Sequence, residues 1–170
     1  MNESVAQPSL PPEAHAGVLR GLYRFRQSSR EGTRRVQLLG AGAMLGEAIK
    51  AAAELEAEHG VAADLWSVTS FSELARDGVA AETAWRHGQA DVLRSHIGEQ
   101  LAPTLGPIVI ATDYVRAVPE QIRAFLPLGR PCVTLGTDGF GRSDTRAALR
   151  RHFEVDAEAI VQAALRALDR

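Results

Sequence analysis

A glycine-rich loop with charged side chains follows one of the predicted strands near the end of the chain. Residues 135–144 read LGTDGFGRSD, which combines three glycines with the charged residues Asp138, Arg142 and Asp144. Asp113 also follows a predicted strand, and Arg116 lies near it in the sequence. Open α/β sheets bind ligands beyond the carboxyl ends of their strands, where both segments are expected. Together they would suit a ligand that carries negative charge.

The same residues also have a structural explanation, which we favour. Asp144 or Ser143 stands where its side chain can cap a following helix, and Asp138 precedes a glycine with which it can fix a turn. Arg116 and Arg142 then pair with these carboxylates or with another domain. We therefore expect the loop to be a structural element and an interface rather than a ligand site.

A second glycine-rich segment, residues 40–46, follows a predicted strand and opens a predicted helix. Free backbone N–H groups at such a helix start can bind phosphate. The spacing G-x-G-x-x-x-G differs from the dinucleotide fingerprint, and residues 68–71 lack the acidic side chain that usually ends the second strand. The glycines also simply permit a tight turn and close packing. A stand-alone phosphate- or nucleotide-binding domain that uses this turn remains the alternative function.

Residue patterns typical of metal binding or nucleophilic catalysis are missing from the sequence. Histidines stand at positions 15, 59, 87, 96 and 152, where no two are spaced i, i+4 and none has a second ligand at metal spacing. Ser67, Ser70 and Ser72 lie outside any G-x-S-x-G elbow. Cys132 is flanked by apolar residues and reads as a small buried side chain. We predict no catalytic, cofactor-binding or metal-binding residue on this chain.

Length and charge restrict the possible partners. The chain has 170 residues, of which 45% are hydrophobic, so one α/β domain is expected to bury about 70% of its unfolded surface. The 19 basic residues are dispersed among 21 acidic ones, which predicts no nucleic-acid partner and no membrane surface. Apolar runs are only strand-length, and the first thirty residues lack a signal-peptide pattern. We expect a cytoplasmic protein.

The order of predicted elements favours an α/β fold. Residues 1–13 hold three prolines and no apolar period, so they are predicted to form a linker or extended arm before a domain at residues 14–170. A short helix and a half-exposed edge strand at residues 22–26 come first. Further strands are predicted from residue 36 and at residues 63–68, 108–111 and 132–135. Helices are predicted at residues 43–58, 70–78, 80–87, 92–101, 119–125, 144–153 and 157–168. This alternation favours a mostly parallel sheet with helices on its faces.

Several strings resemble the C-terminal domain of the homodimeric, thiamine-diphosphate-dependent decarboxylating component of the pyruvate dehydrogenase complex. They occur in order at residues 1–3 and the proline-rich segment, 21–23, 36–40, 68–78, 112–114 and 135–144, and at Asp156. The resemblance implies the three-layer fold of the transketolase C-terminal domain, with a five-stranded, mostly parallel mixed sheet and helices on both faces. Residues 78–103 depart most from the family pattern.

The resemblance implies a supporting role in a larger enzyme. In this family two preceding domains carry catalysis, and the last domain packs in the dimer without binding thiamine diphosphate itself. The parent reaction is the oxidative decarboxylation of pyruvate, followed by reductive acetylation of a lipoyl group. The implied partners are the other domains of the parent chain, its homodimer mate and, through the parent, the dihydrolipoyl acyltransferase component.

The residues that hold the cofactor in such enzymes are missing from this sequence. Thiamine-diphosphate enzymes carry Gly-Asp-Gly and, further along, paired asparagines that complete the magnesium and diphosphate site. This chain has Gly-Thr-Asp-Gly at residues 136–139, and its only asparagine is Asn2. We expect thiamine diphosphate and magnesium in the parent enzyme, no cofactor on this chain and no activity of the isolated chain. We also predict that residues 137–143 of the first glycine-rich segment, called here the glycine-framed loop, contact a neighbouring domain. The residues expected to make this contact are Thr137, Asp138, Phe140, Arg142 and Ser143.

Overall fold

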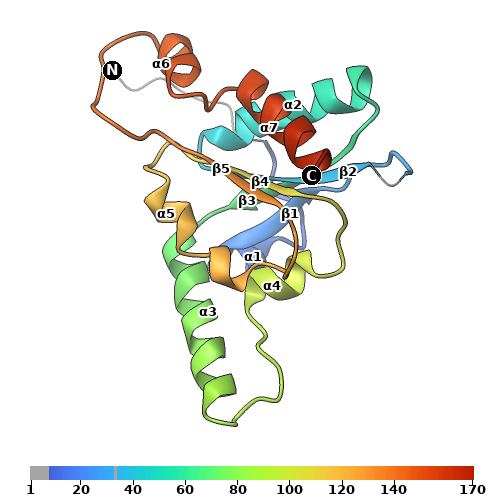
Figure 1. Cartoon of the computed structure of the whole chain (residues 1–170), viewed down its shortest axis with the longest axis vertical. Helices are drawn as coiled ribbons and strands as arrows, with labels where there is room; N and C mark the ends of the chain where they lie inside the picture. The colour runs from blue at the N-terminus through green and yellow to red at the C-terminus, as the bar shows by residue number, and fades with distance from the viewer. Residues whose placement is uncertain (1–7, 33) are drawn as a thin grey trace.

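A mixed sheet forms the centre of the molecule (Figure 1). The computed structural model describes residues 8–32 and 34–170, and within them the sheet has five strands in the order β1-β3-β2-β4-β5. The strands are β1 (Leu22–Arg26), β2 (Arg35–Ala41), β3 (Ala62–Val68), β4 (Ile108–Ala111) and β5 (Cys132–Leu135). β1 pairs antiparallel with β3, and the other pairs are parallel. The predicted five-stranded, mostly parallel mixed sheet is confirmed, with β1 at its edge.

Helices cover both faces of this sheet, which gives three layers (Figure 1). One face carries α2 (Met44–Glu58), α6 (Arg146–His152) and α7 (Ala157–Leu168). The other face carries α1 (His15–Leu19), α3 (Phe71–Arg86), α4 (His96–Leu101), α5 (Ala117–Glu120) and the 3₁₀ helix Arg123–Phe125. Successive β2 residues supply the two cores, because Leu38 packs toward α2 and α7 and Leu39 packs toward α3 and α4. Within the described residues, no helix is long and apolar enough to cross a membrane.

The central strands are buried on both faces, as their apolar runs predict. Every residue of β3 and β4 is buried, which is the usual environment of parallel strands between two helical layers. β5 is different because it lies at the sheet edge, and all four of its residues are only half-buried. The prediction that Cys132 is buried is therefore wrong, because its side chain is only half-buried. This partial burial still raises the pKa of its thiol.

The segment between β3 and β4 departs most from the sequence prediction. A single helix, α3, replaces the two predicted helices, and it runs through Gly78 without interruption. Gly78 faces the ring of Phe125, where a Cβ atom would come within 2.2 Å of Cδ2. The glycine therefore permits close packing inside a helix rather than ending it. α4 is also shorter than predicted, because Ser95 caps it by accepting a hydrogen bond from the Gly98 N–H.

Other helix ends differ from the prediction in detail. The single helix predicted at residues 119–125 is divided into α5 and a 3₁₀ helix. α6 is capped by Thr145, whose Oγ1 accepts from the Ala148 N–H at 3.3 Å, rather than by Asp144 or Ser143. Ser70 caps α3 by accepting from the Glu73 N–H at 3.1 Å, and the Glu73 carboxylate pairs with Arg76. Asp156 caps α7 by accepting from the Ala159 N–H at 3.1 Å.

A part of the predicted linker lies outside the described residues. Residues 1–7 are not described, and residues 8–13 contain no helix or strand. The division into a linker at residues 1–13 and a domain at residues 14–170 stays a prediction.

A buried carboxylate joins the helices on the α2 face. Glu47 is only 5% exposed, which is unusual for a carboxylate. Its Oε1 accepts from Arg150 Nη1 at 2.8 Å and from Lys50 Nζ at 2.9 Å, and its Oε2 accepts from the Ala157 N–H at 3.1 Å. One carboxylate therefore links α2 to α6 and to the first residue of α7.

A second buried carboxylate satisfies polar groups at the amino ends of β2 and β3. Asp64 accepts from the Ser28 N–H at 2.9 Å, from Arg35 at 2.6 Å and from Gln37 Nε2 at 2.8 Å. The side-chain oxygen of Gln37 in turn accepts from Trp66 Nε1 at 2.8 Å. Because these buried groups all have partners, the sheet can hold a carboxylate in its interior without the penalty of an unpaired charge.

The Glu47 linkage predicts an acid-sensitive contribution to stability. Burial alone would raise the pKa of Glu47, but the hydrogen bonds and charges of Lys50 and Arg150 and the hydrogen bond from the Ala157 amide outweigh it and hold this pKa below its ordinary value. The folded state therefore binds fewer protons than the unfolded state as the pH falls. The contribution is complete above the ordinary carboxyl pKa and is lost as the pH drops through the lower folded value.

Glu47→Gln should lower the free energy of unfolding at pH 7 by about 2 kcal/mol, and the difference from wild type should shrink in acid. Urea denaturation at several pH values measures both effects. Glu58→Gln, at the exposed end of the same helix, is the control and should change stability by less than about 0.5 kcal/mol. Equal stability of Glu47→Gln and wild type at pH 7 would show that the linkage is not stabilising.

The Gly78 contact predicts opposite effects for two helical glycine substitutions. Gly78→Ala should destabilise the domain by about 1–3 kcal/mol, because the added methyl group meets the Phe125 ring. Gly46→Ala, in α2, adds its methyl group where nothing lies within 4 Å, so it should stabilise by about 0.5–1 kcal/mol. Thermal denaturation of both variants checks the difference, and a Gly78→Ala protein as stable as Gly46→Ala would exclude the packing argument.

Candidate functional site

A cleft lies beyond the carboxyl ends of the parallel strands. The order in which successive strands are placed in the sheet reverses between β2 and β4. After β2 the chain adds β3 on one side of it, and after β3 it crosses back to add β4 on the other side. Such a switch point is where open α/β sheets commonly bind ligands. The cleft has a volume of about 540 Å³, which is within the range of small-molecule sites.

Four segments that are distant in the sequence form the walls of this cleft. Ala43 and Met44 come from the turn after β2, Asp113 follows β4, and Thr137, Gly139, Gly141 and Arg142 belong to the loop after β5. The last wall consists of α6 and the residues after it, with Arg146, Leu149, Arg150, Phe153 and Val155. Residues 146, 149 and 150 share one face of α6 because they are spaced i, i+3 and i+4.

Hydrogen bonds fix the loop after β5 against the loop after β4. The Arg116 N–H and Nε donate to the two oxygens of Asp138 at 2.8 and 2.5 Å. The Thr137 N–H donates to the Tyr114 carbonyl at 2.9 Å, and Thr137 Oγ1 donates to the Asp113 carbonyl at 2.8 Å. The hydrogen bond from the Arg116 amide and its guanidinium lower the pKa of Asp138, and Asp138 raises the pKa of Arg116. Asp138 is thus a structural anchor of the loop.

The remaining candidate residues of this loop are exposed. Phe140 is 96% exposed, and neither it nor Ser143 lines the cleft. Asp144 accepts from the Thr145 N–H at 2.6 Å, so it supports the start of α6. Arg142 lines the cleft and, among the described residues, has no hydrogen-bond or ion-pair partner. The loop therefore has one side toward the cleft and another toward solvent.

The α6 residues were not assigned to a site from the sequence, and Met44 was considered only as part of the glycine-rich turn at residues 40–46. Arg146 and Arg150 fall within the helix predicted at residues 144–153, but their spacing does not show which segment they face. The only available signal was that two arginines lie one helical turn apart directly after the glycine-rich loop.

The glycine turn at residues 40–46 has a packing role. A Cβ atom on Gly40 would lie 2.6 Å from the Leu45 Cα, and Gly42 has a φ of +55°. The turn therefore needs glycine to bring the start of α2 against the end of β2. Its contribution to the cleft is the wall formed by Ala43 and Met44.

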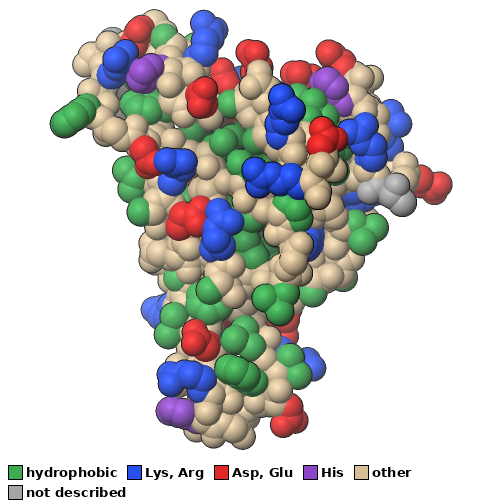
Figure 2. All heavy atoms as spheres, viewed as in Figure 1, with side chains coloured by type: hydrophobic (Ala, Val, Ile, Leu, Met, Phe, Trp, Pro, Cys, Tyr) green, Lys and Arg blue, Asp and Glu red, His purple; other side chains and the backbone are tan. Residues whose placement is uncertain are grey.

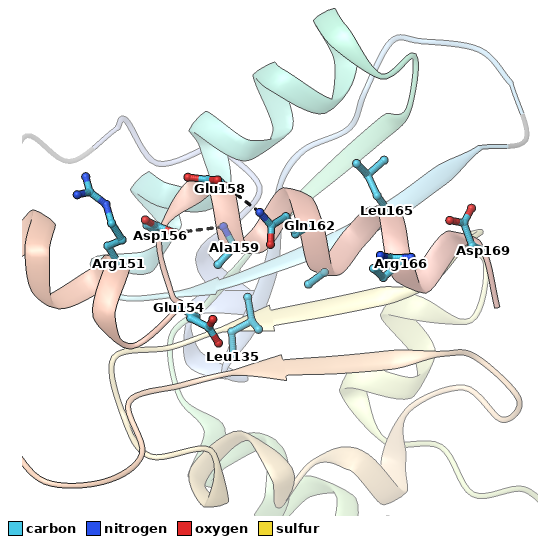
Figure 3. A pocket seen from close by; sticks show the side chains of 11 residues that line it. Leu135, Arg151, Glu154, Asp156, Glu158, Ala159, Gln162, Leu165, Arg166 and Asp169 are labelled. Carbon is cyan, nitrogen blue, oxygen red and sulfur yellow. Dashed lines mark hydrogen bonds between the residues drawn. The ribbon is translucent and has the colours of Figure 1, made fainter.

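A larger hollow lies between the outward side of α7 and the end of β5 (Figure 3). It has a volume of about 750 Å³ and carries the acids Glu154, Asp156, Glu158 and Asp169 with the bases Arg151 and Arg166. Figure 3 shows these charged groups spread along the whole helix rather than directed at one point. Asp156 is engaged in capping Ala159. The described side chains of this surface do not converge on one point where a small ligand could bind.

One histidine has acidic neighbours that its sequence spacing did not suggest. Ligand atoms of Glu54, Glu58 and His59 lie within 4.8 Å of one another at the end of α2. Glu58 is exposed, and the other two residues are half-exposed. Exposed carboxylates of this kind are hydrated, so their proximity alone does not mark a metal site.

Comparisons with known proteins agree with the fold. The family model described as "Transketolase-like TK C-terminal domain" matches residues 21–156. A pyruvate dehydrogenase E1 component from Pseudomonas aeruginosa is 44% identical over 169 residues, which is 99% of this chain and 19% of that protein. The corresponding protein of Mycobacterium tuberculosis is 47% identical over 172 residues, covering 98% of this chain and 18% of its own length.

Solved structures show the same architecture at lower sequence identity. Transketolase from Leishmania mexicana superposes with a TM-score of 0.57 at 19% identity, over 91% of this chain and 19% of that one. This similarity shows the fold alone. The chain spans about a fifth of the length of the curated relatives that it matches.

Proposed function

This chain belongs to the family of transketolase-like C-terminal domains and is homologous to the C-terminal part of pyruvate dehydrogenase E1 components, and we propose that it is an assembly domain of such an enzyme. In this proposal the parent enzyme decarboxylates pyruvate with thiamine diphosphate and transfers the acetyl group to a lipoyl group. The observation that carries the proposal is sequence identity above 40% along nearly the whole chain, together with a surface that suits an interface.

The described residues do not fit a site for thiamine diphosphate and magnesium. Both oxygens of Asp138, the acid in the Gly-Thr-Asp-Gly string, are occupied by Arg116. The cleft offers Asp113 as its one lining carboxylate and faces it with three arginines, whereas Mg²⁺ requires several oxygen ligands. The proposal therefore places the cofactor and the chemistry on other parts of the parent enzyme.

Exposed apolar side chains on two adjoining loops support an interface. Phe140 projects from the glycine-framed loop, and Tyr114 and Val115 are exposed on the loop to which Thr137 is hydrogen-bonded. Exposed aromatic side chains of this kind are typical anchors of protein interfaces. Because the relatives are about five times as long as this chain, the proposed occupant is a neighbouring domain of the parent or of its homodimer mate.

The charge distribution supports a protein partner as well. Acidic and basic side chains are interspersed with hydrophobic ones over the face shown in Figure 2, and no field of a single sign covers it. A surface of this kind favours packing against protein over binding to nucleic acid or anionic lipid. The acyltransferase component would be reached through the parent enzyme, in the cytoplasm.

A chimera tests this function. The segment of the Pseudomonas aeruginosa relative that is homologous to this chain is replaced by this chain, and Phe140→Ala is introduced. Because the substitution removes an interface anchor, dimer association measured by sedimentation should weaken by about tenfold. Pyruvate-dependent activity at low protein concentration should fall by about the same factor.

Leu128→Ala is the matched control in the same chimera. Leu128 is 98% exposed on the loop before β5, so it has similar exposure at the opposite end of the strand. It should leave association and activity unchanged. If Phe140→Ala behaves like Leu128→Ala, the proposed interface is wrong.

A further inference from the structure

We propose that the cleft beyond β2 and β4 binds a small amphipathic organic anion, with a carboxylate or phosphate head on an apolar body. This inference goes beyond the assembly role, because it assigns a ligand site to the domain itself. It rests on the combination of charge, apolar surface and position in one hollow.

The polar side of the cleft has an excess of positive charge. Arg142, Arg146 and Arg150 line it, and Asp113 is the one carboxylate among the described lining residues, while Glu47 pairs with Arg150 from behind the lining. Arg150 is mostly buried, and one of its nitrogens is engaged by Glu47, which fixes the guanidinium and leaves other N–H groups for a ligand. Arginine side chains bind carboxylate and phosphate through paired hydrogen bonds, so this wall suits either head group.

Within residues 8–32 and 34–170, Arg142 has no hydrogen-bond or ion-pair partner, unlike two other arginines near this edge. Arg116 pairs with Asp138, and Arg150 pairs with Glu47. Arg142 lines the cleft on a loop that the Asp138 and Thr137 hydrogen bonds hold in place. The N–H groups of its guanidinium can therefore donate hydrogen bonds to an anion in the cleft.

The apolar side of the cleft suits the body of such a ligand. Leu149 and Phe153 provide half-buried apolar surface, and the almost fully buried Met44 and Val155 lie beneath it. Inorganic phosphate would leave this surface in contact with water, whereas an alkyl or aromatic group would cover it. Each methylene group that enters the apolar surface contributes about twofold to fourfold in affinity.

The first turn of α2 adds to the preference for negative charge. Ala43 and Met44 stand at the amino end of this 15-residue helix, where the dipole and free N–H groups favour an anion. The switch point of the sheet thus brings together a helix start, three arginines and an apolar floor. The larger hollow along α7 has four acids and two bases among its described lining residues and lacks this combination.

Calorimetric titration of the whole chain tests the proposal with simple probes. The probes are hexanoate, hexyl phosphate, acetate, inorganic phosphate and 1-hexanol. Hexanoate or hexyl phosphate should bind to one saturable site, and whichever binds tighter identifies the head group. Acetate, inorganic phosphate and hexanol should each bind at least about tenfold more weakly, because each lacks one half of the ligand.

Variants locate the site. Arg142→Ala should weaken binding of the tighter probe at least about fivefold, since it removes a charged hydrogen-bond donor from an exposed loop that the fold does not need. Arg151→Ala, on the same short helix but outside the cleft lining, should leave affinity within about twofold. Circular dichroism establishes that both variants are folded.

Three results would overturn the proposal. One is the absence of saturable heat with both hexyl probes, and another is equal affinity for inorganic phosphate and hexyl phosphate. The third is an equal effect of Arg142→Ala and Arg151→Ala, which would mean that the anion binds by surface charge alone.

Discussion

The buried carboxylate of Glu47 is the interaction on which the carboxyl-end side of this domain depends. It accepts hydrogen bonds from Arg150 of α6 and from the first N–H of α7, and so joins both to α2. α6 has no fully buried residue among those described, so its own apolar surface cannot position it firmly. The ion pair supplies the missing constraint, and the cleft wall exists because α6 is held there.

The strands were predictable from the sequence because each is a short apolar run between turn residues, and β4 and β5 were predicted at their observed bounds. The errors arose where a distant residue decides the local structure. Gly78 continues a helix because Phe125 packs on it, and Glu47 is buried because Arg150 meets it from the other end of the chain. The cleft was only half predictable, since Arg142 and Asp113 stand at recognisable strand ends but the facing arginines of α6 do not.

The glycine-framed loop combines two roles on opposite sides. Asp138 and Thr137 fix its backbone to the neighbouring loop, which leaves Phe140 exposed to solvent and places Arg142 at the cleft. The similarity to transketolase at 19% identity establishes the architecture only, and one fold can serve many functions. Function is therefore inferred from the pyruvate dehydrogenase relatives and from the side chains of this loop.

We propose that this chain supports an enzyme whose cofactor is held by other parts of the parent protein. Release of carbon dioxide from labelled pyruvate by the purified chain, with thiamine diphosphate and magnesium added, tests it most directly. Release should be no faster than in the protein-free mixture. Cofactor-dependent turnover that rises in proportion to the concentration of the chain would contradict it.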